Sequence, residues 1–179
     1  MKYRNLALVV LLVSVVFAGC KKIEDALDVT FNADFVADLL VSIPTGTKAD
    51  VGTFNVVETV DPSAVSTDVS QYINLIKDVT VTDITGKIIN ISKDVTITNL
   101  VISVASEGSS TVTWTYPNPI PITDGTEISF DATQLAALNT LMSGLTPFTV
   151  TASGTTSEDD VTFTIQVSMT TVVTANPLN

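Results

Sequence analysis

The chain has 179 residues, a length that suits one domain together with a targeting segment, and 45% of them are hydrophobic. It contains no histidine and a single cysteine, which excludes His-based catalytic triads, His metal sites and an internal disulfide. The formal net charge is −11, so nucleic acid and anionic lipid surfaces would repel the chain. We therefore expect no nucleic-acid partner and no cofactor.

The amino-terminal residues have the pattern of an export signal. Lys2 and Arg4 form a short positive region, and an apolar run from Leu6 to Phe17 is interrupted only by Ser14. This run is too short for a transmembrane helix, which needs ~20 apolar residues, but it suits the hydrophobic region of a signal peptide.

Ala18 and Gly19 then precede Cys20, and this order resembles a bacterial lipoprotein signal. The resemblance implies that residues 1–19 are cleaved off, that Phe17, Ala18 and Gly19 form the cleavage signal, and that Cys20 becomes the acylated first residue. Phe17 departs from the family pattern, which most often has leucine at this place. The alternatives are an ordinary secretory peptide and an anchor helix with an incidental cysteine.

Acylation of Cys20 would make the lipid bilayer a partner and would place the protein at the cell envelope, where we expect the outer membrane, on either face. Two or three acyl chains anchor stably, because each buried methylene contributes ~0.8 kcal/mol. Residues 20–27 would form a short tether, with a reach of about 25 Å at ~3.3 Å per residue. Loss of residues 1–19 would leave six basic and 19 acidic groups, a charge of −13.

From Val29 onward, apolar and polar residues alternate, which predicts β-strands with one buried face. The first run keeps one parity as far as Ile43, and this length predicts a bend or bulge near Ala37-Asp38, with a helix over residues 33–40 as the alternative. Residues 161–169 alternate without a fault and predict a central strand. Further strands are predicted around residues 54–60, 77–82, 93–104 (with a change of phase), 111–116, 128–130 and 148–151.

Two short helices interrupt these strands. Asp68 would cap the first helix, and Asp131 begins the second with a pattern similar to a capping box. Leucines recur at helical spacing in the second helix, for which Gly144 is the expected end. Turns are predicted at Thr85-Gly86, residues 107–110, Asp124-Gly125 and residues 153–156.

Eight or nine short strands and two short helices predict an all-β fold, an antiparallel β-sandwich of immunoglobulin-like architecture. A closed β-barrel is the alternative. The Cys…Trp…Cys spacing of antibody domains is absent, so the label describes architecture alone. No linker divides residues 28–179, which we interpret as one domain.

Trp114 and Tyr116 share the parity of Val112 and lead into a proline-rich stretch at residues 117–121, which excludes a central strand there. An aromatic pair beside a stiff loop, together with Asn118, is a candidate site for a glycan or a peptide. The structural interpretation is that Trp114 is the largest residue of the core, and base rates of aromatic burial favour it.

Two acidic loops are candidate calcium sites: Asp124 with Glu127, and Glu158 with Asp159 and Asp160. Neither follows an EF-hand spacing, and the alternative is a solvated acidic turn. Thr-x-Thr pairs recur along the strands and resemble ice-binding arrays, but irregular spacing favours ordinary half-exposed strands.

No catalytic residue is predicted, because the chain has no recognisable nucleophile motif and no histidine. The expected function is that of a membrane-anchored, non-catalytic lipoprotein, a binding, adhesion or accessory module whose partner is a glycan, a peptide or an envelope protein. The alternative is an envelope hydrolase that uses two carboxylates held ~5–9 Å apart across a sugar cleft.

Overall fold

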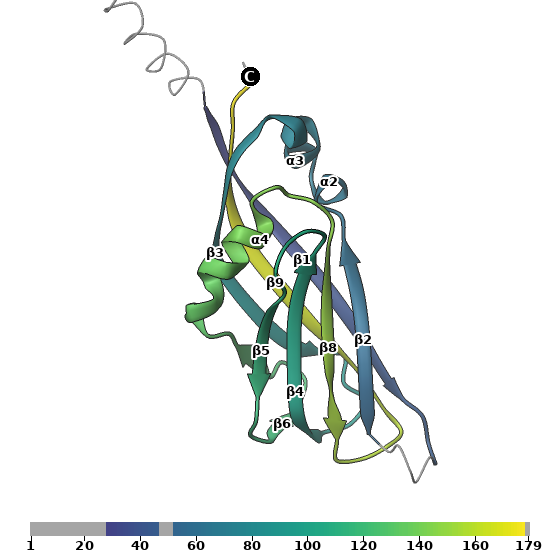
Figure 1. The fold of residues 1–179 in the computed structure, drawn as a ribbon. Helices are drawn as coiled ribbons and strands as arrows, with labels where there is room; N and C mark the ends of the chain where they lie inside the picture. Colours follow the sequence, from purple (N-terminus) through teal and green to yellow (C-terminus); the bar gives the residue numbers. More distant parts are fainter. Residues whose placement is uncertain (1–27, 47–51, 178–179) are drawn as a thin grey trace, which may run out of the picture.

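The computed structural model describes residues 28–46 and 52–177, and in this part nine strands form two antiparallel sheets (Figure 1). Sheet A has the order β1-β9-β3-β7 and sheet B the order β2-β8-β4-β5, with β6 also paired to β4. Sheet A comprises β1 (Val29–Ile43), β3 (Ile76–Ile89), β7 (Glu127–Ser129) and β9 (Val161–Ala175). Sheet B comprises β2 (Thr53–Val60), β4 (Val95–Ser106), β5 (Val112–Tyr116), β6 (Ile120–Ile122) and β8 (Phe148–Thr156).

The predicted β-sandwich is therefore confirmed. The closed barrel is wrong for the described residues, because each sheet ends in edge strands, β1 and β7 in sheet A and β2 and β5 in sheet B.

Successive strands cross between the sheets at most connections. As a result, β9 lies between β1 and β3 in sheet A, and β8 lies between β2 and β4 in sheet B. This is the strand order of a jelly roll, in which two Greek keys build facing sheets. It differs from the immunoglobulin order, in which the first two strands pair within one sheet. The immunoglobulin-like prediction holds only for the packing of two sheets face to face.

The first and last strands pair along their whole length. Their register runs from Val29 opposite Ala175 to Ile43 opposite Val161 without a shift, so the predicted bulge near Ala37 and the helical alternative are both wrong. A bulge is unnecessary because β9 offers an equally long, regular partner. β9 also pairs with β3 on its other side, which confirms the prediction of a central strand.

Irregular pairing occurs instead in β3 and β4. β3 shifts register between Ile76 and Asp78 and again between Val81 and Asp83. β4 shifts after Thr98, where Asn99 has a φ of 53°. Asparagine tolerates this left-handed conformation better than most residues, and the shift produces the predicted change of phase in β4.

Aromatic pairs join the two sheets across the core. Phe35 of β1 contacts Phe148 of β8 with ring centroids 6.0 Å apart, and Phe54 of β2 contacts Phe163 of β9 at 5.8 Å. Both pairs are edge to face, with interplanar angles of 90° and 89°. Such a geometry contributes about 0.5–1.5 kcal/mol beyond the burial of area, so these pairs help to hold the sheets in register.

Two predicted turns lie inside strands. Gly86 belongs to β3 and Gly154 to β8, whereas the turns at residues 107–110 and at Asp124-Gly125 are confirmed. The two glycines are needed for packing. A Cβ on Gly86 would lie 3.0 Å from Cε2 of Phe130, and one on Gly154 would lie 3.0 Å from Cζ of Phe54. Each glycine makes room for an aromatic ring from another element.

The first helical region consists of α2 (Pro62–Val65), α3 (Thr67–Tyr72) and the 3₁₀ turn η1 (Ile73–Leu75). The prediction that Asp68 caps this helix is wrong, because Asp68 lies in the first turn of α3. The cap is Ser66, whose Oγ accepts a hydrogen bond from the backbone N–H of Val69 at 3.1 Å. Ser66 directly precedes the first helical residue, where its side chain can pair with a backbone N–H that has no partner within the helix, so Ser66 has the capping role predicted for Asp68.

The second helical region consists of the 3₁₀ turn η2 (Ala132–Gln134) and α4 (Leu135–Met142). The capping role of Asp131 is confirmed, since its Oδ1 accepts a hydrogen bond from the N–H of Thr133 at 2.9 Å. α4 ends two residues before Gly144, and the positive φ after the helix, 43°, is that of Leu145. Oδ1 of Asn139 in α4 accepts a hydrogen bond from the N–H of Val81 at 2.6 Å, so the helix covers part of the β3 edge.

We predict that Gly86→Ala lowers the free energy of unfolding by about 1–3 kcal/mol, because the new methyl group would overpack Ile128 and Phe130. Gly144→Ala is the matched control. Its Cβ would lie 3.7 Å from Cγ2 of Thr146, so a change within about 0.5 kcal/mol is expected. Urea unfolding followed by the fluorescence of Trp114, the single tryptophan, measures both. Equal stability of the two variants would contradict the close packing at Gly86.

Candidate functional site

Three aromatic rings join the edges of the two sheets. Trp114 and Tyr116 of β5 both contact Phe130, which follows β7, with ring centroids 5.0 Å and 6.4 Å apart. Nε1 of Trp114 donates a hydrogen bond to the carbonyl of Asp131 at 3.3 Å, and the hydroxyl of Tyr116 donates one to the carbonyl of Ser129 at 2.9 Å. We call Trp114, Tyr116 and Phe130 the aromatic clamp.

The clamp places Trp114 in the core, with 4% of its surface exposed. Its indole N–H is satisfied by backbone, so the residue has both the apolar contacts and the polar partner that a buried tryptophan needs. This is the structural interpretation of Trp114. Tyr116 is half-buried, and Asn118 is exposed in the loop after β5.

Burial also affects the phenol of Tyr116. Loss of solvent raises the pKa of Tyr116 from its ordinary value of 10.0 to about 12, because the charged phenolate is disfavoured away from water. The hydroxyl therefore stays protonated and remains a donor to Ser129 through the physiological range.

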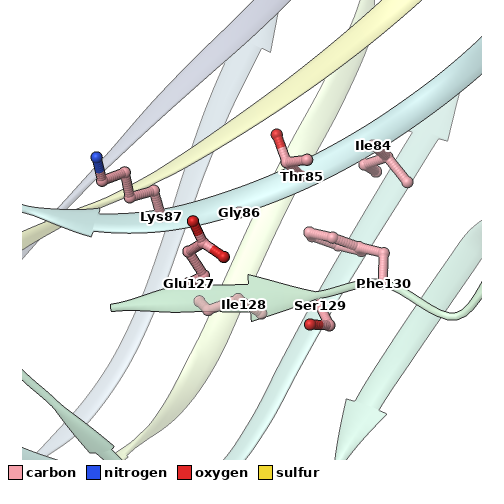
Figure 2. Close-up of a pocket in the computed structure, with 8 residues that line it drawn as sticks. All are labelled: Ile84, Thr85, Gly86, Lys87, Glu127, Ile128, Ser129 and Phe130. Carbon is pink, nitrogen blue, oxygen red and sulfur yellow. The ribbon is translucent and has the colours of Figure 1, made fainter. Parts of the chain in front are cut away.

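Next to the clamp, a cavity of about 360 Å³ is lined by the paired strands β3 and β7 and by Phe130 (Figure 2). Figure 2 shows Lys87 and Glu127 on neighbouring strands, and the ring of Phe130 beside Gly86. Lys87 is directly opposite Glu127 in the β3–β7 register. The lining is completed by backbone and side chains of Ile84, Thr85, Ile128 and Ser129.

A second hollow of about 210 Å³ lies on the other side of the clamp, next to Trp114 and Tyr116. It is lined by Thr113, Thr115, Ser129, Asp131 and Gln134 as well. Hydroxyl and amide groups here could hydrogen-bond a small polar ligand. A two-carboxylate hydrolysis needs a second acid in the same cleft, and these two cavities have one each, Glu127 and Asp131.

The candidate calcium ligands have other partners. Oδ1 of Asp124 accepts a hydrogen bond from the N–H of Asn90 at 2.8 Å, and Oδ2 of Asp159 accepts one from the N–H of Gly46 at 2.8 Å. Oε2 of Glu158 lies 3.1 Å from Nζ of Lys93. These carboxylates stabilise loops at one end of the sandwich.

Glu127 lines the cavity of Figure 2, and Asp160 takes a φ of 52° in the turn before β9. Within residues 28–46 and 52–177, no cluster of three or more His, Cys, Asp or Glu side chains could hold a metal ion.

Cys20 and the cleavage signal Phe17, Ala18 and Gly19 lie outside the described residues, and so does the tether. None of the helices in the described ranges has the length and apolar character needed to cross a bilayer.

Charge is divided unequally between the two sheets. The strands of sheet A contain acidic and basic residues, whereas those of sheet B contain a single charged residue, Glu58 of β2. The alternation of β2 places Glu58 on the opposite side from Val57 and Thr59. We call the outward side of the strands of sheet B the threonine face. None of its strand residues is charged, although Glu107 and Asp131, from the loops after β4 and β7, line hollows at its margin. The face consists of Thr53, Asn55, Val57, Thr59, Thr96, Thr98, Val101, Ser103, Ala105, Thr113, Thr115, Thr149, Thr151, Ser153 and Thr155.

The Thr-x-Thr pairs of the sequence were a signal for this face, but they did not separate the two sheets. The pairs at residues 80/82 and 162/164 belong to sheet A, and those at 96/98 and 149/151 to sheet B. Asp78 shares the sheet of the first group, and Asp94 precedes β4. Neither aspartate therefore interrupts the threonine face.

No family model matches the chain, and no curated protein matches it. Among solved structures, it is similar to a chain of Desmodium yellow mottle tymovirus, with 12% identity, a TM-score of 0.32, and 84% of this chain and 85% of that chain covered. It is also similar to the decameric BFDV capsid protein, with 6% identity, a TM-score of 0.37, and coverage of 82% and 99%. At these identities and TM-scores, neither match supports an inference about function.

We predict that Tyr116→Phe removes a phenol ionisation near pH 12 from the absorbance titration of the folded protein. Because the folded pKa lies above that of the unfolded chain, the contribution of Tyr116 to stability is complete below pH 10 and is lost as the pH rises through 12. Near neutral pH the free energy of unfolding of the variant should be lower by about 1 kcal/mol, because the hydrogen bond to Ser129 is lost. Loss of an ionisation near pH 10 instead of pH 12 would contradict the buried position of the phenol.

Proposed function

We propose that the protein is a lipid-anchored, non-catalytic lipoprotein of the bacterial cell envelope, in which the β-sandwich is an accessory or assembly module. One observation carries this proposal: Lys2 and Arg4, the apolar run, and Ala18-Gly19-Cys20 occur in the order of a lipoprotein signal. The body that follows begins its first strand at Val29. The outer membrane is the expected site.

The geometry of the described domain is compatible with an anchor at one end. The first residues of β1 and β3, Val29 and Ile76, both lie opposite Ala175 at the end of β9. An ion pair of 2.9 Å between Nζ of Lys77 and Oδ2 of Asp28 joins the start of the domain to β3 at the same end. A tether from Cys20 would thus enter at this end.

The opposite end would then point away from the membrane. β1 has 15 residues and spans about 50 Å at ~3.3 Å per residue. The acidic loop at residues 157–160 and the turn at residues 90–94 lie at its far end, next to Ile43 and Val161. Repulsion between the acidic loop at residues 157–160 and anionic headgroups favours the same orientation.

The choice of an accessory or assembly role rests on the aromatic clamp. Trp114 is buried, Phe130 packs against its ring, and Tyr116 is hydrogen-bonded to the backbone of β7. The clamp therefore offers no exposed aromatic platform for a sugar ring. We therefore propose an envelope protein, rather than a glycan, as the partner.

Cys20→Ala tests the anchor. We expect the wild type to be recovered in the membrane fraction with an added acyl mass and the variant to lose both, because Cys20 is the residue to which the lipid would be attached. Ser14→Ala, which leaves the cleavage signal intact, is the control and should behave as the wild type. A variant that stays in the membrane, together with a wild type of unmodified mass, would refute the lipoprotein proposal.

A further inference from the structure

The threonine face has properties that the anchor does not explain. Surfaces of soluble domains are typically about 25–35% charged, yet none of the outward positions of sheet B carries a charge in a chain of net charge −11. Sheet A differs, because Asp34 and Asp38 of β1 and Asp78 and Asp83 of β3 lie on its strands. The absence of charge is thus a property of one face.

We propose that the threonine face is a self-association surface, on which a second copy of this chain, anchored in the same membrane, packs sheet against sheet. This inference rests on the proposed lipid anchor. Two copies of an acidic protein repel one another over most of their surface. If two copies met through their threonine faces, no acidic residue of a strand in one copy would lie against an acidic strand residue of the other.

The chemistry of the face suits contact with a copy of itself. A hydroxyl group is both donor and acceptor, so a row such as Thr151 and Ser103, which are directly opposite in the β8–β4 register, can hydrogen-bond an identical row. Val57 and Val101 add apolar contact within the same face. An interface between identical patches related by a two-fold axis requires this kind of self-complementarity.

The direction of the strands also fits two anchored copies. The strands of sheet B extend between the end of the domain at which β1 begins and the opposite end (Figure 1). The face is therefore parallel to the long direction of the domain. A two-fold axis along that direction would set two threonine faces against each other while both tethers enter the same membrane.

The size of the face indicates a weak contact. Four strands at ~4.8 Å spacing and seven residues at ~3.3 Å give about 440 Å² per copy. Stable complexes bury about 800 Å² per partner, so the free domain is expected to be monomeric in dilute solution. Confinement to one membrane raises the effective concentration, and a weak contact then becomes populated.

Variants of the full chain with one added cysteine test this surface in membranes of cells that express it; Cys20 is kept, and its acylated sulfur does not react with a maleimide. Ser103→Cys places a thiol at the centre of the threonine face, and Ser168→Cys places one at the centre of the outward side of sheet A. Both serines are half-buried. With a short bis-maleimide, we expect at least about fivefold more cross-linked dimer from Ser103→Cys than from Ser168→Cys, because only the first thiol would lie near its counterpart.

A second variant separates contact from random collision. Thr151→Glu, added to Ser103→Cys, sets like charges across the contact and should reduce cross-linking to the level of Ser168→Cys. Equal cross-linking of the two single variants, or no effect of Thr151→Glu, would overturn the self-association. Cross-linking of the wild type, whose one cysteine is Cys20, would show a free thiol and contradict the anchor instead.

Discussion

The structure depends on the pairing of β9 with both β1 and β3. β1 is the first strand of the domain and β9 the last, so each of their 15 residue pairs, from Val29 and Ala175 to Ile43 and Val161, joins segments more than a hundred residues apart. Sheet A cannot be completed before the C-terminal strand is available. Long-range pairing of this kind makes folding slow, since the loop must be closed before contacts repay the lost entropy.

The two sheets are then held together by side chains that reach across the core. The edge-to-face pairs Phe35–Phe148 and Phe54–Phe163 act within the sandwich, and the aromatic clamp acts at its edge. The clamp uses two polar groups, the indole N–H of Trp114 and the hydroxyl of Tyr116, to hold the last residue of β7 and the short segment after it. The aromatic residues that first suggested a ligand site are in this way explained by the architecture.

With the aromatic residues and most of the acidic loop residues engaged in structure, the surface itself becomes the main functional feature. Carboxylates such as Asp124 and Asp159 accept backbone hydrogen bonds at the end opposite the start of β1. The threonine face extends along the side of the domain, and none of its strand residues is charged. A lipid anchor at one end and an uncharged side would together favour copies that stand next to each other on a membrane, which is the arrangement we propose.

The sequence by itself determined the all-β fold, the central position of residues 161–169 and the capping role of Asp131, because alternation and capping are local properties of the chain. It also carries the whole of the anchor prediction. The turns predicted at Gly86 and Gly154 were wrong. A glycine that makes room for the ring of Phe130 or Phe54 cannot be told from a turn glycine by sequence, because the ring comes from a distant part of the chain. Only the tertiary structure decided the jelly-roll order and the division of charge between the sheets, since both depend on which strands pair at long range.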